Sequence, residues 1–292
     1  MSNDSLGDRM KTYEDAFRTH LPIRMPIIIR IDGKAFHSYT KGCKRPFDQK
    51  LTDTMDITAK ALCKEVQGCQ LAYVQSDEIS LLLVNYEDLD TQSWFDNNLQ
   101  KMVSISAATA SSTFTIESWR IWMGGVMAPV GLESLKPARF DARAFVLPKE
   151  EVCNYFLWRQ QDATRNSVQM VARSLYSHKE CTDKNNSQLQ EMIFQKGMNW
   201  DKLPTSQKRG RCIVRQLSNR PATNKKTGET TNVIRSEWIV DNEIPIFSQD
   251  RYFIEKFVYP GQEIPTSPEE QKAVWDDLIA RQGYSDIDDC TT

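Results

Sequence analysis

Hydrophobic patterning predicts a strand and then a helix near the start of the chain. Residues 26–31 (PIIIRI) form a β-branched run that ends at Asp32-Gly33, which is typical of a buried strand followed by a turn. Beyond a loop rich in Lys, Gly and Pro, apolar residues recur at helical spacing over residues 51–66. Asp48 stands where a helix cap is expected and Gly68 where the helix should end.

The next segments complete a recognisable order of elements. Two strand-like runs, 70–75 and 79–86, are separated by a short polar interval and predict a hairpin. Residues 97–114 predict a second helix, and residues 140–147 alternate apolar and polar as a half-buried strand does. The order strand, helix, strand, strand, helix, strand is that of a ferredoxin-like split βαβ unit. We therefore expect an α+β fold with an antiparallel sheet and helices on one face, like the palm of many polymerases and nucleotidyl cyclases.

The second half of the chain has a different pattern. A long amphipathic helix is predicted from Pro148 to Leu175, a shorter one at 188–195, and two strands at 211–217 and 233–240. The strands flank a polar, basic turn that contains Lys225, Lys226, Thr227 and Gly228, and the acidic tail after Pro265 predicts a helix around Trp275 and Leu278. We expect a palm-like catalytic domain at 1–148 and a helical and hairpin region at 149–292, whose helices could share one core with the palm.

Composition restricts the class of protein. The 292 residues are 40% apolar and 10% aromatic, which is enough to bury a substantial core. The 37 Lys and Arg and 39 Asp and Glu give a formal net charge of -2, which excludes a strongly polybasic protein but not a local basic groove. No apolar run approaches the roughly 18–20 residues that cross a bilayer, and the polar start does not resemble a secretory signal. The seven cysteines form no C-x-x-C pair, so neither a zinc finger nor a disulfide framework is expected. A cytoplasmic protein without membrane contact is expected.

Acidic residues follow the first strand and the hairpin. In a split βαβ sheet these elements are neighbours, so Asp32 and Asp77 are expected within metal-bridging distance, with Glu78 beside them. Two such carboxylates repel each other, and Mg²⁺ is a hard cation that binds carboxylates together with substrate phosphates. The simpler alternative is that Asp32-Gly33 is only a turn and Asp77-Glu78 a solvated hairpin tip. The predicted strand order favours the metal site.

The loop after the first strand is a candidate phosphate-binding segment. Gly33 would let the backbone approach a phosphate, and successive amides over residues 33–37 could form an anion nest. The chain contains no Walker A motif. Phe36 is more typical of a core residue than of a base-stacking residue, and a lone His37 is more often structural than catalytic.

Four motifs occur in order: IRIDGKAFHSYTKGCKRPFD (29–48), LAYVQSDEISLLL (71–83), FDARAFVLP (140–148) and WRQQDATRNS (158–167). Together they resemble the tRNA-His guanylyltransferase family, and more specifically its Thg1-like branch. The resemblance spans residues 13–215, and the R-I-D-G-x-x-F-H and Q-S-D-E blocks are much more specific together than either is alone.

The resemblance implies a palm that adds nucleotides in the 3′-to-5′ direction, in which the 3′-hydroxyl of an incoming nucleotide attacks the activated 5′ end of a tRNA. It implies that Asp32 and Asp77 hold two Mg²⁺ ions with the Gly33 carbonyl as a further ligand, and that Glu78 is needed for catalysis. GTP, ATP and other nucleoside triphosphates would be substrates. The residues implied to bind them are Asp32, Gly33, Lys34, Ala35, Phe36, His37, Lys44, Ser76 and Asp77.

The chain departs from the eukaryotic members in the long helix. After Trp158-Arg159-Gln160, their H-I-N-N-L-Y motif is replaced by residues 164–169 (TRNSVQ), in which only Asn166 matches. That motif accompanies untemplated addition of one G to tRNA-His, so its loss favours template-dependent repair of 5′-truncated tRNA. The family also implies a homotetramer and a basic tRNA-binding surface. The candidates for this surface in the present chain are Arg159, Arg165, Asn166, Lys208, Arg209 and Arg215. Any single charged residue among them could instead be a solvated surface charge.

Three functions therefore stay open. The first is a Mg²⁺-dependent nucleotidyltransferase at tRNA 5′ ends, acting in repair or in G addition to tRNA-His. The second is a nucleotidyl cyclase on the same palm, which would need no RNA-binding half and no basic segment at 208–215. The third is an inactive nucleic-acid-binding module, against which the three neighbouring acids argue, because buried carboxylates are unfavourable without a compensating cation.

Overall fold

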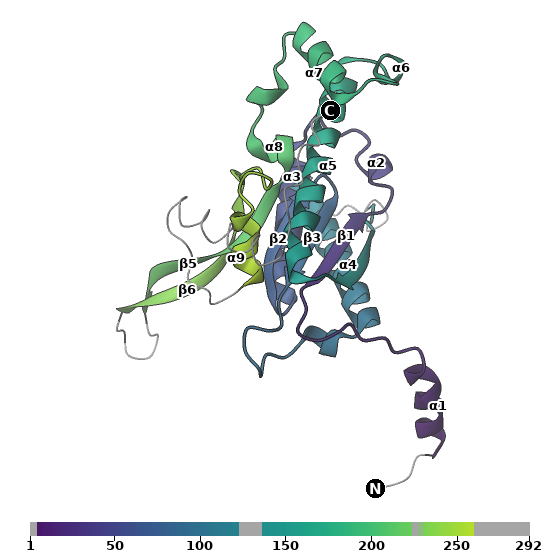
Figure 1. The fold of residues 1–292 in the computed structure, drawn as a ribbon, viewed down its shortest axis with the longest axis vertical. Helices are drawn as coiled ribbons and strands as arrows, with labels where there is room; N and C mark the ends of the chain where they lie inside the picture. Colours follow the sequence, from purple (N-terminus) through teal and green to yellow (C-terminus); the bar gives the residue numbers. More distant parts are fainter. Residues whose placement is uncertain (1–4, 123–135, 224–227, 229, 260–292) are drawn as a thin grey trace, which may run out of the picture.

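The computed structural model describes residues 5–122, 136–223, 228 and 230–259. These residues form one six-stranded antiparallel sheet in the order β4-β1-β3-β2-β5-β6 (Figure 1). The strands are β1 (Ile27–Gly33), β2 (Cys69–Gln75), β3 (Glu78–Leu83), β4 (Phe140–Val146), β5 (Arg211–Thr223) and β6 (Thr230–Asp241).

The first four strands have the order expected for a split βαβ unit. Helix α3 (Gln49–Glu65) connects β1 to β2, and α4 (Leu99–Trp122) follows β3 in the chain and precedes β4. The Asp48 side chain caps α3 by accepting a hydrogen bond from the amide of Lys50 over 2.9 Å. The predicted antiparallel α+β architecture is confirmed.

Helices cover both faces of the sheet, so the expectation of helices on one face is wrong. Helices α3 and α4 pack on the face that carries Ile27 and Ile29. Helices α5 (Lys149–Leu175) and α9 (Tyr252–Val258) pack on the opposite face, over Ile28 and Leu82. The reason lies in β1 and β3, whose consecutive apolar residues point to both faces and would leave one set in water without a second cover.

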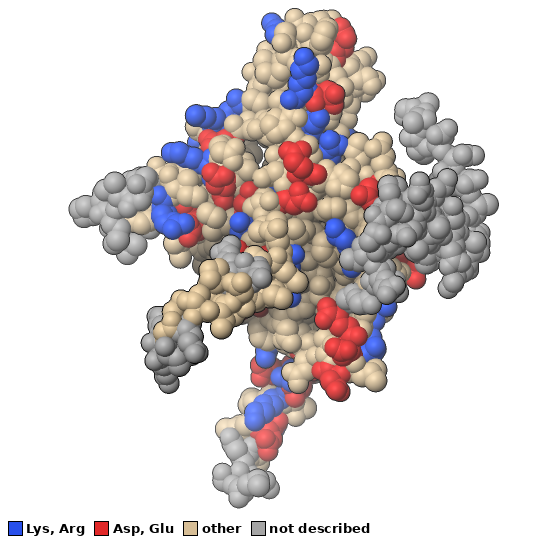
Figure 2. Space-filling model, turned by 90° about the vertical axis from the view of Figure 1, so that its left-hand side faces the viewer, with Lys and Arg blue, Asp and Glu red and all other residues tan. Residues whose placement is uncertain are grey.

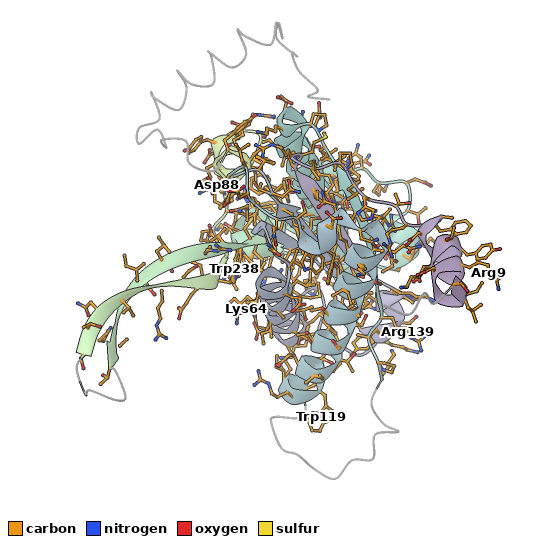
Figure 3. The ribbon with its side chains drawn as sticks, turned by 90° about the horizontal axis from the view of Figure 1, so that it is seen from below. Arg9, Lys64, Asp88, Trp119, Arg139 and Trp238 are labelled. Atoms are coloured by element: carbon orange, nitrogen blue, oxygen red, sulfur yellow. The ribbon has the colours of Figure 1, made fainter. Side chains whose placement is uncertain are left out.

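The second core joins the two halves of the chain. It combines Ile28 and Tyr73, from before residue 148, with Phe156 and Phe247, from after it. The β5–β6 hairpin extends the same sheet, because β5 pairs with β2 with Leu71 opposite Val214. Its strands are longer than predicted, and the hairpin and α1 (Ser5–Asp15) project from the body on different sides (Figure 3).

The other helices are short or lie at the periphery. Helix α7 (Asn186–Gln195) confirms the shorter helix predicted for the second half. The rest are α2 (Phe36–Tyr39), α6 (His178–Cys181), α8 (Thr205–Arg209) and the 3-10 turns η1 (Trp94–Asn97) and η3 (Trp200–Lys202). Among the described helices none has the length and apolar character needed to cross a membrane. The predicted tail helix around Trp275 and Leu278, and the turn residues Lys225, Lys226 and Thr227, lie outside the described residues.

Candidate active site

The end of β1 and the turn of the β2–β3 hairpin lie side by side. Asp32 is paired with Glu78 across the β1–β3 ladder. The amide of Gly33 donates a hydrogen bond to the carbonyl of Asp77 over 3.1 Å. The turn itself is the two-residue segment Ser76-Asp77, and Ser76 has the positive φ, 46°, that tight hairpin turns use. The fold thus brings Asp32 and Asp77 to the same edge of the sheet.

Asp77 lies where its negative charge is disfavoured. Burial raises the pKa of the Asp77 carboxyl and the charges of Asp32 and Glu78 raise it further, whereas hydrogen bonds from its own amide and from Ser76 lower it. A cation at this point would relieve the repulsion. Two carboxylates and the Gly33 carbonyl are oxygen donors of the kind that Mg²⁺ prefers. The chemistry of this donor set therefore fits a divalent cation.

Glu78 is engaged by α5 instead. Its two carboxylate oxygens accept hydrogen bonds from Nε and Nη2 of Arg159 over 2.7 and 2.8 Å. The Arg159 side chain is 6% exposed and also donates to Asp162. The expected contact between Arg159 and tRNA is not possible in this arrangement, because the guanidinium is buried and paired. Within the described ranges no three His, Cys, Asp or Glu side chains are grouped so as to hold a metal ion.

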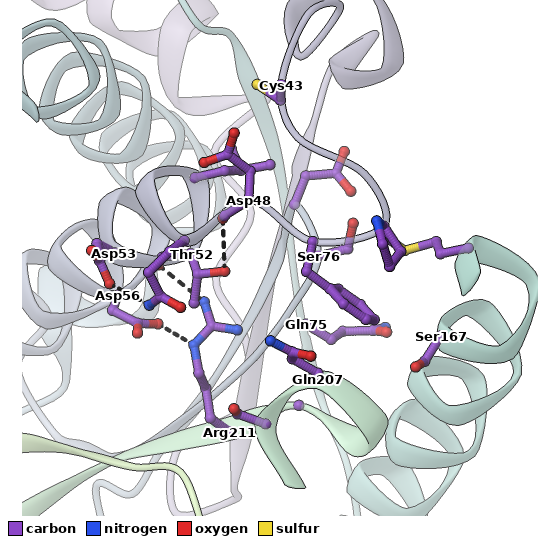
Figure 4. Close-up of a pocket in the computed structure, with 18 of the residues that line it drawn as sticks. Cys43, Asp48, Thr52, Asp53, Asp56, Gln75, Ser76, Ser167, Gln207 and Arg211 are labelled. Atoms are coloured by element: carbon purple, nitrogen blue, oxygen red, sulfur yellow. Dashed lines mark hydrogen bonds and ion pairs between the residues drawn. The ribbon is translucent and has the colours of Figure 1, made fainter. Parts of the chain in front are cut away.

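A cavity of about 1040 Å³ opens beside the hairpin turn (Figure 4). Its volume is at the upper end of the range for small-molecule sites. Its walls come from the loop after β1, the hairpin turn, α3, α5, and the segment from α8 into β5. The predicted site residues that line it are Phe36, His37, Lys44, Ser76, Asp77 and Asn166, whereas Asp32, Gly33, Lys34 and Ala35 lie outside its lining.

Packing determines the shape of the loop after β1. Phe36 is 4% exposed and lies in the aromatic core, as its residue type suggests. A Cβ atom on Gly33 would lie 2.4 Å from the Phe36 ring, so only glycine fits at this position. The amides of Gly33 and Lys34 already donate to the carbonyls of Asp77 and Arg139. These two donors of the expected anion nest are therefore used within the protein.

One wall of the cavity was missed by sequence reasoning. Arg211, at the start of β5, is buried, and its guanidinium donates to the Asp56 carboxylate and, over 3.2 Å, to the Thr52 carbonyl (Figure 4). Asp48, Thr52 and Asp56 recur every four residues and so share one side of α3. That polar repeat in an otherwise amphipathic helix was an available signal. Nothing in the sequence pointed to their partner Arg211, which is 155 positions from Asp56.

The remaining tRNA candidates fall into two groups. Arg165, Lys208 and Arg209 line a second cavity of about 520 Å³ beside α5, where Arg165 and Lys208 are each paired with an aspartate. Arg215 is exposed on β5, and its guanidinium carbon lies 4.9 Å from the centre of the Trp238 ring. On the face shown in Figure 2, basic and acidic side chains are interspersed.

Protein Mg²⁺ sites usually combine one or two carboxylates with substrate phosphates. Two neighbouring carboxylates beside a large cavity are therefore typical of enzymes that act on phosphorylated substrates. The family model described as "Thg1: tRNAHis guanylyltransferase" matches residues 7–148. A solved structure of a bacterial tRNA(His) guanylyltransferase (Thg1)-like protein in complex with ATP is 46% identical, with a TM-score of 0.73 over 88% of this chain and 100% of that one. A second such structure, in complex with GTP, has the same identity and coverage and a TM-score of 0.71.

More distant relatives agree with this assignment. A probable tRNA(His) guanylyltransferase of Drosophila melanogaster is 28% identical over 65% of this chain and 67% of its own length. The chain belongs to the tRNA(His) guanylyltransferase family, as its motifs predict, and it is a nucleotidyltransferase.

Proposed function

We propose that this nucleotidyltransferase adds nucleotides in the 3′-to-5′ direction to the 5′ end of tRNA in the cytoplasm, and that it repairs 5′-truncated tRNA with the opposite strand of the acceptor stem as template. The observation that carries the proposal is the cavity that ends on Asp77, next to Asp32. A cavity of about 1040 Å³ is large enough for a nucleoside triphosphate. The two similar bacterial proteins, in complex with ATP and with GTP, support the same class of substrate.

In this proposal the sheet is a polymerase-like palm, and Asp32, Asp77 and the Gly33 carbonyl hold two Mg²⁺ ions. Bound there, the ions would lower the pKa of the attacking 3′-hydroxyl and stabilise the leaving pyrophosphate. The contribution of the chain is to hold the two carboxylates next to each other, through the β1–β3 ladder and the hydrogen bond from Gly33 to Asp77.

Polar side chains of the cavity would orient the triphosphate. Lys44 and Arg45 line it from the loop after β1 and offer positive charge to the phosphates. His37 and Ser76 supply further hydrogen-bonding groups near Asp77, and Asn166 faces the same cavity from α5. These residues bind and orient the substrate and take no part in bond making.

The second half of the chain would hold the tRNA. Arg165, Lys208 and Arg209 around the second cavity, and Arg215 on the hairpin, are candidates for contacts with backbone phosphates, which add affinity without reading sequence. We include a homotetramer in the proposal, in which one subunit holds the tRNA for the active site of another.

A second candidate function is the addition of one G to tRNA-His. The names of the curated relatives favour it, since several are tRNA(His) guanylyltransferases. The loss of the H-I-N-N-L-Y motif argues against it, because the chain retains only Asn166 of the six residues.

The test is incubation of the full-length protein with labelled 5′-truncated tRNA, the four nucleoside triphosphates and Mg²⁺. Extension by the missing nucleotides supports repair, extension of full-length tRNA-His alone supports G addition, and a cyclic nucleotide indicates a cyclase. Asp77→Ala should abolish transfer while tRNA binding persists, and Asp90→Ala, at an exposed position, is the matched control. Wild-type turnover by Asp77→Ala would remove Asp77 from the mechanism.

A further inference from the structure

Arg159 on α5 binds Glu78 in a geometry that leaves little freedom. Two guanidinium nitrogens donate to the two oxygens of Glu78 over 2.7 and 2.8 Å, which is the bidentate form of this interaction. The two side chains are 6% and 12% exposed, so little water competes for the pair. The guanidinium carbon also lies 4.4 Å from the centre of the Trp158 ring, which restricts its orientation.

Besides the apolar packing of the second core, two polar side-chain contacts join β3 to α5 in the part of the chain that the structure describes, and this pair is one of them. One turn earlier on the helix, the hydroxyls of Tyr155 and Ser80 are 2.8 Å apart. Ser80 and Glu78 are two residues apart on the strand, and Tyr155 and Arg159 are four apart on the helix, so each pair lies on the facing side of its element. Because Asp77 directly precedes Glu78, the Arg159 contact fixes the end of the strand from which the hairpin turn departs.

The same guanidinium is connected to the wall of the large cavity. Arg159 Nη2 donates to Asp162 over 2.9 Å, and Asp162 also accepts a hydrogen bond from Asn166 over 3.3 Å. Gln75, at the other end of the hairpin turn, hydrogen-bonds to Asp162 as well. Both Asn166 and Gln75 line the cavity. Arg159 on the long helix is therefore connected both to β3, the strand that begins directly after Asp77, and, through Asp162, to the wall of the large cavity.

We propose that Arg159 is a positioning residue for nucleotide transfer. It holds Glu78 so that the hairpin turn presents Asp77 beside Asp32, and Glu78 serves the reaction through this ion pair and not as a ligand of the metal ions. The inference rests on the nucleotide transfer proposed above. In this inference Arg159 positions Glu78 within the enzyme and does not contact tRNA. Glu78 in turn fixes the position of Asp77, the residue before it.

The test compares Arg159→Met, Glu78→Gln and the double variant in the full-length protein. For each, kcat, KM for the nucleoside triphosphate and the Mg²⁺ concentration at half-maximal rate are measured at a temperature where circular dichroism shows the variant to be folded. Arg159→Lys keeps the positive charge and serves if the Met variant does not fold. Arg251→Lys is the matched control, because Arg251 also donates a hydrogen bond to a side chain of α5, that of Asn154, and not to Glu78 or Asp162, the partners of Arg159.

Each single variant should lower kcat by about 100-fold, the loss that a displacement of about 1 Å can produce, with a smaller change in KM. The kcat of the double variant should be no lower than that of the less active single variant, because both substitutions remove the same interaction. Arg159→Lys should lose less than Arg159→Met, since lysine keeps the charge but not the bidentate contact. The Mg²⁺ requirement of Glu78→Gln and the kcat of Arg251→Lys should match the wild type.

Three results would each overturn the inference: wild-type kcat in the Arg159 variants, losses that multiply in the double variant, or a raised Mg²⁺ requirement in Glu78→Gln. If the wild-type protein itself transfers no nucleotide, the proposed function fails instead. The two failures are therefore distinguishable in the same assay.

Discussion

Replacing Arg211 by Met should destabilise the protein strongly. The side chains of Arg211 and Asp56 are 5% and 13% exposed. The guanidinium donates to the Asp56 carboxylate and to the Thr52 carbonyl, so its removal leaves a buried carboxylate without a partner. Breaking a buried ion pair in this way costs about 3–5 kcal/mol. A loss of that size should lower the melting temperature of a protein this large by about 10 °C.

The loss should also depend on pH. Burial raises the pKa of Asp56 above its ordinary value, and the charge and hydrogen bond of Arg211 oppose that rise. When the pKa of a carboxyl is higher in the folded protein than in the unfolded chain, the free energy of unfolding falls as the pH rises from the pKa of the unfolded chain through that of the folded protein. Without Arg211 the folded pKa rises further. The deficit of Arg211→Met should therefore be larger at about pH 8 than at about pH 5.

Thermal melting at the two pH values is the assay. The double variant Asp56→Asn with Arg211→Met should be more stable than Arg211→Met alone, because no buried charge is left without a partner. Arg215→Met, at an exposed position on the same strand, should change stability by no more than about 0.5 kcal/mol. The reasoning from burial is refuted if Arg211→Met has the melting temperature of the wild type at both pH values. It is also refuted if the loss of stability is the same at both.

Three further predictions concern the loop after β1, the sheet and α3. Gly33→Ala should lower the free energy of unfolding in urea by about 1–3 kcal/mol and remove most transfer activity, because the added Cβ would lie 2.4 Å from the Phe36 ring. A variant as stable as the wild type would contradict this. Tyr73→Phe should lose about 1–2 kcal/mol, because the buried hydroxyl donates to the Arg209 carbonyl over 2.6 Å; an unchanged unfolding midpoint would show that this bond adds nothing. Asp48→Ala should lose about 1 kcal/mol of capping energy. Burial acts to raise the pKa of Asp48, but backbone hydrogen bonds lower it below its ordinary value. The stability lost in Asp48→Ala should therefore shrink as the pH falls through the pKa of Asp48 in the folded protein. A loss that does not change with pH would contradict this prediction.

The candidate site was predictable only in part. Asp32 and Asp77 could be placed together because strand order follows from the order of elements, and neighbouring strands bring their ends to one edge. The role of Glu78 could not be predicted, because its partner Arg159 lies 81 positions away on a helix that covers the second face of the sheet. The same helix was expected to offer Arg159 to tRNA, since a charged residue is usually exposed.

The sequence by itself determined the local elements. Hydrophobic spacing, the Asp48 cap and the short polar interval at residues 76–78 act over a few residues, so strands and helices could be located before any packing was known. Only the tertiary structure decided which charges are buried together, as with Asp56 and Arg211, and which face of β1 needed a second cover. The reason is physical: a local pattern shows that a residue prefers burial or a partner, but the partner is selected by the packing of segments that are distant in the chain.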